Sequence, residues 1–192
     1  MKTKERILDA ALALFNEQGT GPVSTNHIAQ AAGISPGNLY YHFENKEAIV
    51  RALFERLFHQ WDIALNLPDD RGPTQQDVEN LIRTNFAIMS QYTFIYRELI
   101  ALLRGDPELQ QRFLIVRERG YQGFRAIIEY FVRTGVLVSP GDEVAVTRLA
   151  DLCWLISEFW MATVEISGHA IDDAQLERGV ALMRQVLQPY LS

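Results

Sequence analysis

Residues 31–46 read AAGISPGNLYYHFENK, and the fold can be inferred outward from this stretch. Gly33 predicts the end of a short helix that begins at Ser24, because glycine takes the left-handed conformation at a helix C-terminus without strain. Ser35 predicts the cap of a second short helix, with Pro36 in its first position. A helix of seven or eight residues is not stable alone, so we expect packing against apolar neighbours to hold it.

A longer helix is predicted on each side of this pair. Before it, apolar residues recur at helical spacing from Ile7 to Phe15, after a cap at Thr3. After it, Asn45 caps a helix whose apolar positions continue to Leu65. Two short helices between two longer ones match the helix-turn-helix arrangement, in which the second short helix enters the major groove of DNA.

The rest of the chain also follows helical periodicity, without convincing strand alternation. After a break at 67–73, five helices are predicted over about residues 74–89, 94–103, 106–135, 142–167 and 172–190. The predicted fold class is therefore all-α. We expect an N-terminal three-helix helix-turn-helix domain at 1–46 and a C-terminal helical domain for ligand binding and dimerisation at 47–192.

Composition limits the class of protein. The chain has 192 residues, 48% of them hydrophobic, which is enough for a packed core. No apolar run approaches the roughly 20 residues that span a bilayer, and the N-terminus lacks the apolar core of a secretory signal. We expect a cytoplasmic protein without membrane contact. The net charge is −6, so any grip on nucleic acid must come from local donors and not from a broad basic field.

The candidate DNA-binding residues fall into two groups, those that suit phosphate oxygens and those that suit base edges. Tyrosine hydroxyls, histidine and lysine suit phosphate oxygens, which orient a protein without reading sequence. Base edges need close approach, an amide that pairs with adenine, or an apolar contact to thymine. The start of the first short helix can also reach a phosphate. The predicted DNA-binding residues are Tyr40, His42 and Lys46 for phosphates, Gly37, Asn38 and Tyr41 for bases, and Thr25, Asn26 and Pro36 beside them.

Residues 25–53, TNHIAQAAGISPGNLYYHFENKEAIVRAL, resemble the signature of the TetR/AcrR transcriptional regulators. The resemblance covers about residues 5–55 and implies a homodimer with an inducer pocket in its C-terminal domain. It implies a repressor that a small molecule releases from a palindromic operator. The sequence departs from the family pattern in one respect: Pro36, Gly37 and Asn38 offer no Arg or Lys to read guanine, so the operator is not predictable.

The C-terminal part carries many aromatic and Met side chains. Its helix at 142–167 is apolar almost all round, and Asp151, Glu158 and Glu165, spaced seven apart, predict one narrow solvent-facing edge. Such a helix must bury more than one face, which favours a cavity beside it. The pocket would take an apolar or aromatic effector. The predicted ligand-binding residues are Phe86, Met89, Tyr96, Phe113, Arg117, Tyr121, Phe124, Trp154 and Trp160.

The last helix has an apolar heptad pattern, which predicts a dimer surface made of two helices from each subunit. Its residues are Leu176, Val180, Met183, Leu187 and Tyr190. A two-fold axis would place two recognition helices on half-sites about 34–36 Å apart, or a multiple of that. The helix from Asn45 to Leu65 is the expected link between pocket and DNA.

The sequence bears on two other classes of protein. An enzyme is disfavoured because the sequence has no Gly-rich phosphate loop and no recognisable catalytic arrangement. A metal site or cofactor is not expected, since Cys153 is the only cysteine and His27, His59 and His169 lack partners at metal-ligand spacing. The alternative that stays open is a helical protein-interaction module on a TetR-like scaffold, without specific DNA binding.

Overall fold

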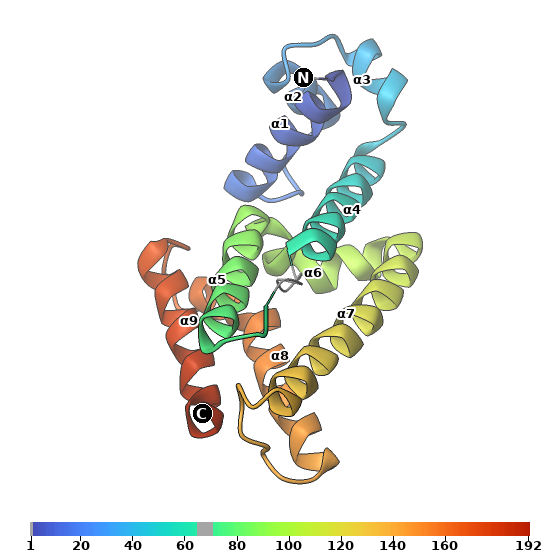
Figure 1. Ribbon diagram of the computed structural model, residues 1–192. Coiled ribbons are helices and arrows are strands. Elements are labelled where there is room, and N and C mark those ends of the chain that lie inside the picture. Colours follow the sequence, from blue (N-terminus) through green and yellow to red (C-terminus); the bar gives the residue numbers. More distant parts are fainter. Residues whose placement is uncertain (1, 65–70) are drawn as a thin grey trace.

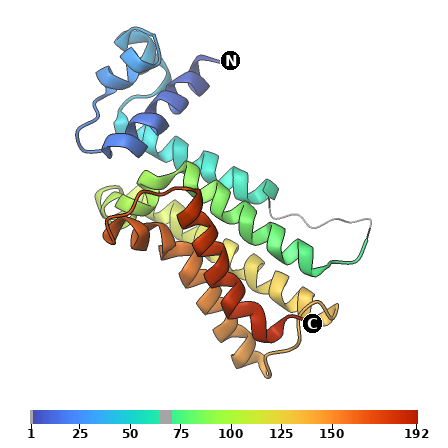
Figure 2. The same cartoon turned by 90° about the vertical axis from the view of Figure 1, so that its left-hand side faces the viewer.

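The computed structural model describes residues 2–64 and 71–192, and these are helical apart from short connections (Figures 1 and 2). An isolated bridge joins Leu137 and Leu191 near the C-terminus. The all-α prediction is confirmed. The elements are α1 (Thr3–Gln18), α2 (Thr25–Ala31), α3 (Pro36–His42), α4 (Lys46–Ala64), α5 (Gln75–Gln91), α6 (Thr93–Gly105), α7 (Pro107–Arg133), α8 (Glu143–Ile166), α9 (Asp173–Leu187) and a 3-10 turn (Gln188–Tyr190).

Figure 1 shows α1–α3 as a separate unit at one end of the molecule, with α4 running from it into a body formed by α5–α9. The N-terminus lies in the small unit and the C-terminus at the far end of the body. Leu65 and most of the break predicted at 67–73 lie outside the described residues.

Most helices begin where capping chemistry predicts. In each case the side-chain oxygen of the capping residue accepts a hydrogen bond from the backbone N–H of the residue three positions later. This bond satisfies one of the first N–H groups of the helix, which have no partner within the helix itself. These caps are Ser24, Ser35, Asn45, Asp106, Asp142 and Asp172, with donor-to-acceptor distances of 2.8–3.3 Å. The prediction for Thr3 was wrong: α1 already includes Thr3, and Lys2 holds the cap position without a side-chain bond.

Two hydrophobic cores lie along the long axis. The first joins α1–α3 to α4 and reaches the start of α6 and α7 through Phe94 and Leu109. The second fills the body between α5, α7, α8 and α9. Trp61 of α4 packs against both. The boundary predicted at 46/47 falls at the first turn of α4, whose Ile49 and Leu53 are fully buried in the first core. This helix therefore serves both parts.

The acidic edge predicted for α8 faces solvent only in part: Asp151 is exposed, whereas Glu158 and Glu165 are half-buried. Asp151 accepts a hydrogen bond from Tyr121 Oη at 2.5 Å, and Glu158 pairs with Arg117 of α7. Glu165 pairs with Arg97 of α6. The seven-residue spacing correctly placed the acids on one stripe, but the stripe faces neighbouring helices. The outward face of α8 is apolar instead and carries Leu152, Leu155, Phe159 and Ile166, which are 44–87% exposed.

Across residues 2–64 and 71–192, every helix is too short or too polar to cross a membrane.

Candidate functional site

The inner faces of α2 and α3 pack into the first hydrophobic core. Ile28 and Leu39 are fully buried, and Phe43, directly after α3, is 6% exposed. The turn between the helices passes through Gly33 at φ +64°, and Arg6 Nη2 of α1 donates to the Ala32 carbonyl at 2.5 Å. The first core and this clamp therefore fix the orientation of α3, which seven residues could not do alone.

The opposite face of α3 is open to solvent. Tyr41 is 84% exposed and Tyr40 52%, and Pro36, Gly37 and Asn38 are exposed as well. A Cβ added at Gly37 would meet nothing within 4 Å. Packing within the protein therefore does not require glycine there. The missing side chain leaves room for another molecule to approach the backbone.

The predicted contacts on α2 join this face. Tyr40 Oη and Thr25 Oγ1 lie 2.9 Å apart, which ties α3 to the start of α2. Asn26 is exposed, whereas Thr25 and His42 are half-buried. The His42 ring meets Tyr41 edge-on, with 5.1 Å between centroids. The structure thus brings hydroxyl, amide and imidazole groups from both short helices close together.

Lys46 is half-buried, and its Nζ donates to the Thr20 carbonyl at 2.6 Å. Thr20 in turn donates to Glu98 of α6 from its backbone N at 2.9 Å and from its hydroxyl at 2.5 Å. A Cβ on Gly19 would lie 2.6 Å from Glu98 Oε1, so the fit is close. Lys46 therefore holds the loop before α2 in place, and its expected phosphate contact remains a prediction.

A second attachment, which was not predicted from the sequence, lies beside this one. Asn16 Nδ2 of α1 donates to the Gln91 carbonyl at 2.8 Å, and Asn16 Oδ1 accepts from Phe94 N at 3.1 Å. Arg97 adds a bond to the Asn16 carbonyl at 3.1 Å. These partners lie 75–81 residues apart in the chain. The α1–α3 unit is thus joined to the body through α6 as well as through α4.

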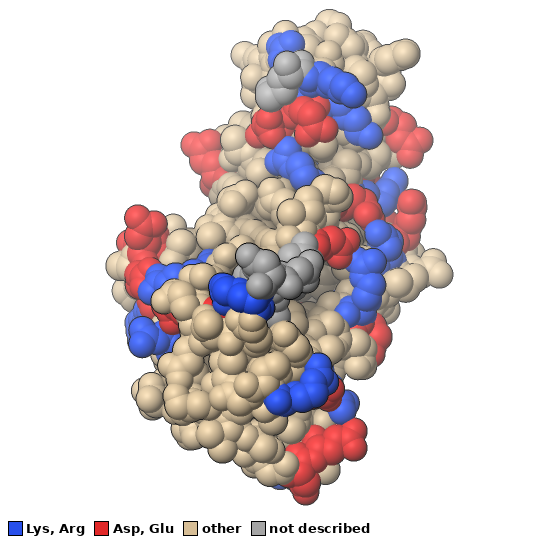
Figure 3. Space-filling view, viewed as in Figure 1, with Lys and Arg blue, Asp and Glu red and all other residues tan. Residues whose placement is uncertain are grey.

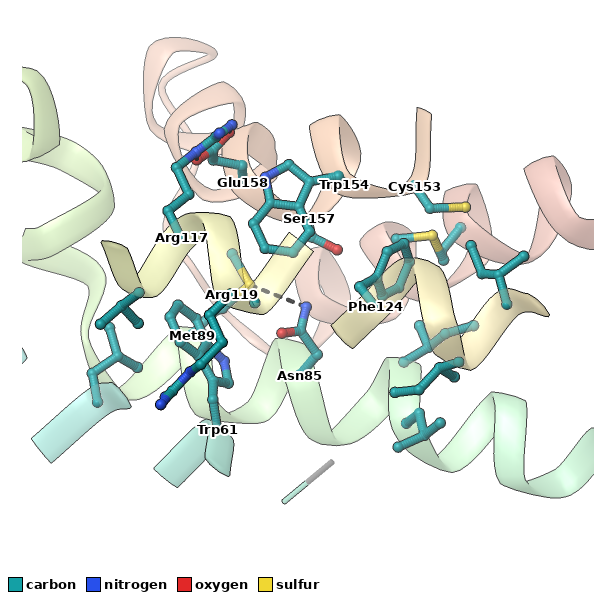
Figure 4. Close-up of a pocket in the computed structure, with 18 of the residues that line it drawn as sticks. Trp61, Asn85, Met89, Arg117, Arg119, Phe124, Cys153, Trp154, Ser157 and Glu158 are labelled. Carbon is teal, nitrogen blue, oxygen red and sulfur yellow. Dashed lines mark hydrogen bonds and ion pairs between the residues drawn. The ribbon is translucent and has the colours of Figure 1, made fainter. Parts of the chain in front are cut away.

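The body encloses a pocket of about 190 Å³ between α4, α5, α6, α7, α8 and α9 (Figure 4). Six of the predicted ligand-binding residues line it: Met89, Tyr96, Phe113, Arg117, Phe124 and Trp154. The pattern of aromatic and Met residues was therefore a useful guide to its position.

Three predicted pocket residues lie elsewhere. Trp160 packs on α9, where a Cβ on Gly179 would lie 2.6 Å from its ring, and its Nε1 donates to the Gln175 carbonyl at 2.8 Å. Phe86 of α5 packs at the same place, with its ring 2.9 Å from the Cβ position of Gly179. Tyr121 stands behind Trp154, edge-on at 5.5 Å between centroids. These corrections share one cause, because periodicity shows that a residue is buried and not what it is buried against.

Several lining residues were missed. Trp61 lies on the helix predicted from Asn45 to Leu65 but was not among the predicted ligand-binding residues, and Glu158 was predicted to lie on a solvent-facing edge. Both line the pocket, as does Asn85, whose Nδ2 lies 3.4 Å from Met89 Sδ (Figure 4). The isolated amide within the apolar pattern of α5 was a signal that could have been used.

The rim of the pocket holds an ion pair. Arg117 Nε and Nη2 donate to the two Glu158 carboxylate oxygens at 2.7 and 2.8 Å, and the guanidinium lies 5.7 Å from the Trp154 ring centroid. The bond to Glu158 raises the pKa of Arg117. Burial, with Glu158 nearby, raises the pKa of Tyr96, so its hydroxyl keeps its proton.

Burial also raises the pKa of the Cys153 thiol to about 12. The Cys153 side chain is fully buried in the second core.

The apolar pattern of α9 packs inside the subunit. Val180, Met183 and Leu187 are 3–6% exposed and belong to the second core, and Met183 and Leu187 also line the pocket. Leu176 and Tyr190 are half-buried. The three central residues of the predicted dimer surface are therefore buried within their own subunit and are not exposed to a partner, and the position of the dimer surface stays a prediction.

Comparison with known proteins agrees with this architecture. Residues 7–53 match the family model described as bacterial regulatory proteins, tetR family, and residues 45–192 match one described as a bacterial transcriptional repressor. The chain belongs to the TetR family. Both models describe transcriptional regulators, which agrees with the prediction that the protein is not an enzyme.

Individual relatives support the same assignment. A TetR-family transcriptional regulator from Marinobacter aquaeolei VT8 has a TM-score of 0.88 and 31% identity, covering 100% of this chain and 92% of that one. The repressor KstR2 of Rhodococcus jostii is 30% identical over 165 residues, 79% of this chain and 76% of that protein. SmeT in complex with triclosan shares the fold, with a TM-score of 0.69 and 19% identity over 100% and 93% of the two chains. The chain spans about half the length of several other curated relatives that it matches.

Proposed function

We propose that the protein regulates transcription by binding a DNA operator through α2 and α3. The observation that carries the proposal is the exposed face of α3, where Gly37, Asn38 and Tyr41 stand on a helix whose rear is locked into the first core. An exposed polar and aromatic face on a rigid support suits DNA recognition, because the docking geometry must be set before contacts form.

The side chains divide into positioning and reading contacts. Tyr40, His42 and Lys46 would bind phosphates, with Thr25 held beside Tyr40. Asn38 would pair with an adenine edge, and Tyr41 would contact a thymine methyl. Gly37, next to Pro36, lets the helix backbone approach the groove, and Asn26 reaches from α2.

Charge supplies little of this binding. Figure 3 shows the end of the molecule that carries α2 and α3 as mostly uncharged, with basic and acidic side chains mixed beneath it. With a net charge of −6, the protein gains no general attraction to DNA. We expect a shallow dependence of affinity on salt, since few Lys or Arg side chains displace counterions from phosphates.

Two subunits would act together on a palindromic operator. The apolar residues on the outer face of α8, together with Leu182 of α9, offer a surface that a second copy can cover. A two-fold axis through this surface would pair the two α3 helices at half-sites about 34–36 Å apart, or a multiple of it. This surface replaces the α9 pattern in the dimer proposal.

The pocket would make the protein responsive to a small apolar or aromatic molecule. A ligand that prefers one spacing of the two α3 helices changes DNA affinity by its preference for that state. SmeT, which shares this fold, forms a complex with triclosan. Release from the operator on ligand binding makes the protein a repressor.

Selection of random duplexes followed by fluorescence anisotropy tests the proposal. We expect a palindromic sequence to be enriched. Asn38→Ala should change which bases are preferred, whereas Tyr40→Phe should weaken binding to every duplex alike. Asn80→Ala, an exposed amide on α5, is the matched control and should bind as the wild type does.

A helical interaction module without DNA binding is the second candidate. The mixed charge around α1–α3 favours it (Figure 3). Enrichment of no duplex in the selection, with the folded dimer intact, would support this alternative and end the DNA proposal.

A further inference from the structure

Three buried hydrogen-bond donors line the pocket without a bond. They are Nε1 of Trp61, Nε1 of Trp154 and the hydroxyl of Tyr96, none of which has a partner among residues 2–64 and 71–192. Only one other buried side-chain N or O atom in the described chain is in the same position, and it does not line the pocket. Indole N–H groups can only donate, and a buried donor left unbonded is costly. Their concentration in one cavity points to a missing acceptor.

The charged groups in the described lining are already neutralised. Arg117 is paired with Glu158 through two bonds, and Arg119 with Asp62 at 2.7 and 3.0 Å. Each pair lies within the lining itself. A carboxylate ligand would therefore find no unpaired guanidinium among these residues, and at the Arg117 end it would meet the negative charge of Glu158.

Apart from Asn85 and Ser157, the remaining lining is apolar, built from side chains such as Leu99, Phe113 and Ile128. A cavity of about 190 Å³ is somewhat larger than the roughly 150 Å³ cavity known to hold benzene. The pocket thus has room for a small ring system with a short substituent.

We propose that the pocket binds a neutral, mostly apolar molecule that carries one or more hydrogen-bond acceptors such as a carbonyl oxygen, and that Trp61, Trp154 and Tyr96 supply the donors, at most two of them to any one carbonyl oxygen. This inference rests on the proposed function, in which the pocket is the effector site. It narrows the effector class by excluding carboxylates and pure hydrocarbons as preferred ligands.

The three donors come from different helices. Trp154 lies on α8, Tyr96 on α6 and Trp61 near the end of α4, and Figure 4 shows the two tryptophans entering from separate helices. A ligand bonded to Trp61 acts directly on the helix whose first residue is Lys46. Tyr96 lies on the helix that holds Thr20 through Glu98. The donor set therefore touches both attachments of the α1–α3 unit.

Three probes of nearly equal shape test the inference by isothermal titration of the full-length protein. Acetophenone offers a neutral carbonyl, α-methylstyrene replaces its oxygen by a methylene group, and benzoate carries a charge. We expect acetophenone to bind at least about tenfold more tightly than α-methylstyrene, and benzoate to bind more weakly than acetophenone.

Substitutions then identify the donors. One or two of the variants Trp61→Phe, Trp154→Phe and Tyr96→Phe should reduce the preference for acetophenone over α-methylstyrene by about threefold or more, because its single carbonyl oxygen accepts two hydrogen bonds. The affinity for α-methylstyrene should change little, and an unchanged preference in all three variants would overturn the inference. The matched controls are Trp160→Phe and Tyr121→Phe, whose polar atoms already bond to the Gln175 carbonyl and to Asp151. Circular dichroism would confirm that each variant folds, and these controls should keep the wild-type preference.

Equal affinity for acetophenone and α-methylstyrene would overturn the inference. Tightest binding of benzoate, failure of all three probes to bind, or an equal loss of preference in the controls would do so too. The proposed function is judged separately by DNA anisotropy. If acetophenone binds with the expected preference but leaves operator affinity unchanged, the donor assignment stands and regulation through this pocket is refuted.

Discussion

Arg117 of α7 and Glu158 of α8 form a two-bond ion pair at the rim of the pocket, with N-to-O distances of 2.7 and 2.8 Å. The carboxylate side chain is 14% exposed and the guanidinium side chain 38%. The pair joins the two helices on which much of the pocket wall depends. It also decides the electrostatic character of the site, because it removes the positive charge that an acidic ligand would seek.

Replacing Glu158→Gln should make the pocket attractive to anions. The change releases the Arg117 guanidinium while keeping the side-chain shape. We expect benzoate affinity to rise about tenfold or more, since a hydrogen bond to a charged group contributes about 1.5–3 kcal/mol. Isothermal titration measures this. Glu118→Gln removes an exposed acid from α7, the helix that carries Arg117, and should leave benzoate binding unchanged. An unaltered benzoate affinity in both variants would show that Arg117 does not govern ligand charge.

Gly179→Ala should destabilise the body. The new Cβ would lie 2.6 Å from the Trp160 ring and 2.9 Å from Phe86. Overpacking of this kind costs about 1–3 kcal/mol, and urea unfolding followed at 222 nm would show it as a lower midpoint. Gly123→Ala on α7 is the matched control, because nothing lies within 4 Å of its Cβ position. That variant should be as stable as the wild type or more so, by up to about 1 kcal/mol.

Leu155→Glu should separate the subunits, because Leu155 is 55% exposed on the apolar face of α8. Light scattering after size exclusion should show a folded monomer that has lost operator affinity. Leu187→Glu should give a different result, since this residue is 6% exposed and a buried charge unfolds the core. Leu114→Glu, at a 56% exposed position of α7, is the control and should remain dimeric. A dimeric Leu155→Glu protein would place the interface elsewhere.

Asp77→Asn should weaken the start of α5 in a pH-dependent way. Arg71 donates to both Asp77 carboxylate oxygens at 2.7 Å, and the Thr74 hydroxyl adds a bond at 2.8 Å. These bonds hold the pKa of Asp77 below its usual value. A lowered folded-state pKa stabilises the protein above the unfolded value of about 4, and this contribution is lost as the pH falls further.

Urea midpoints measured between pH 7 and pH 3 test this expectation. The Asn variant should be less stable than the wild type at pH 7, and the difference should begin to shrink as the pH falls below about 4. Asp173→Asn, an exposed position in the first turn of α9, should show no such change with pH. A difference for Asp77→Asn that stays constant with pH would mean that the carboxylate charge is not what matters.

Gly37→Ala should separate DNA binding from stability. The Cβ has open space around it in the free protein, and alanine is favoured over glycine within a helix by up to about 1 kcal/mol. The variant should therefore be at least as stable as the wild type. Its operator affinity should fall about tenfold or more if the DNA backbone or a base edge approaches this point. Wild-type affinity would show that α3 does not come so close.

The sequence was most informative where structure depends on neighbours in the chain. The cap at Ser35, the proline in the next position and the left-handed Gly33 are local features, and all are present as predicted. The exposed set on α3 followed from the same reasoning, because the apolar positions of a short helix determine which residues remain outside.

Prediction failed where the partner is distant in the chain. Glu158 and Arg117 are 41 residues apart, and nothing near Glu158 indicates a guanidinium. The pattern on α9 correctly showed one apolar face, but a face packed against α5 and α8 has the same periodicity as one packed against another subunit. Trp160 and Phe86 were misplaced for the same reason. The sequence thus predicts burial, and only the folded chain shows what each buried side chain touches.

The length of α4 determines how far a small tilt of this helix displaces its ends. Lys46 and Trp61 are separated by about 22 Å along the axis, at 1.5 Å per residue, so a tilt of about 5° at one end displaces the other by about 2 Å. In a symmetric pair of subunits the two displacements add to about 4 Å, which exceeds the 3.4 Å rise of one base-pair step. A side chain at the far end of one helix can therefore move the pair out of register with its half-sites by more than a nucleotide.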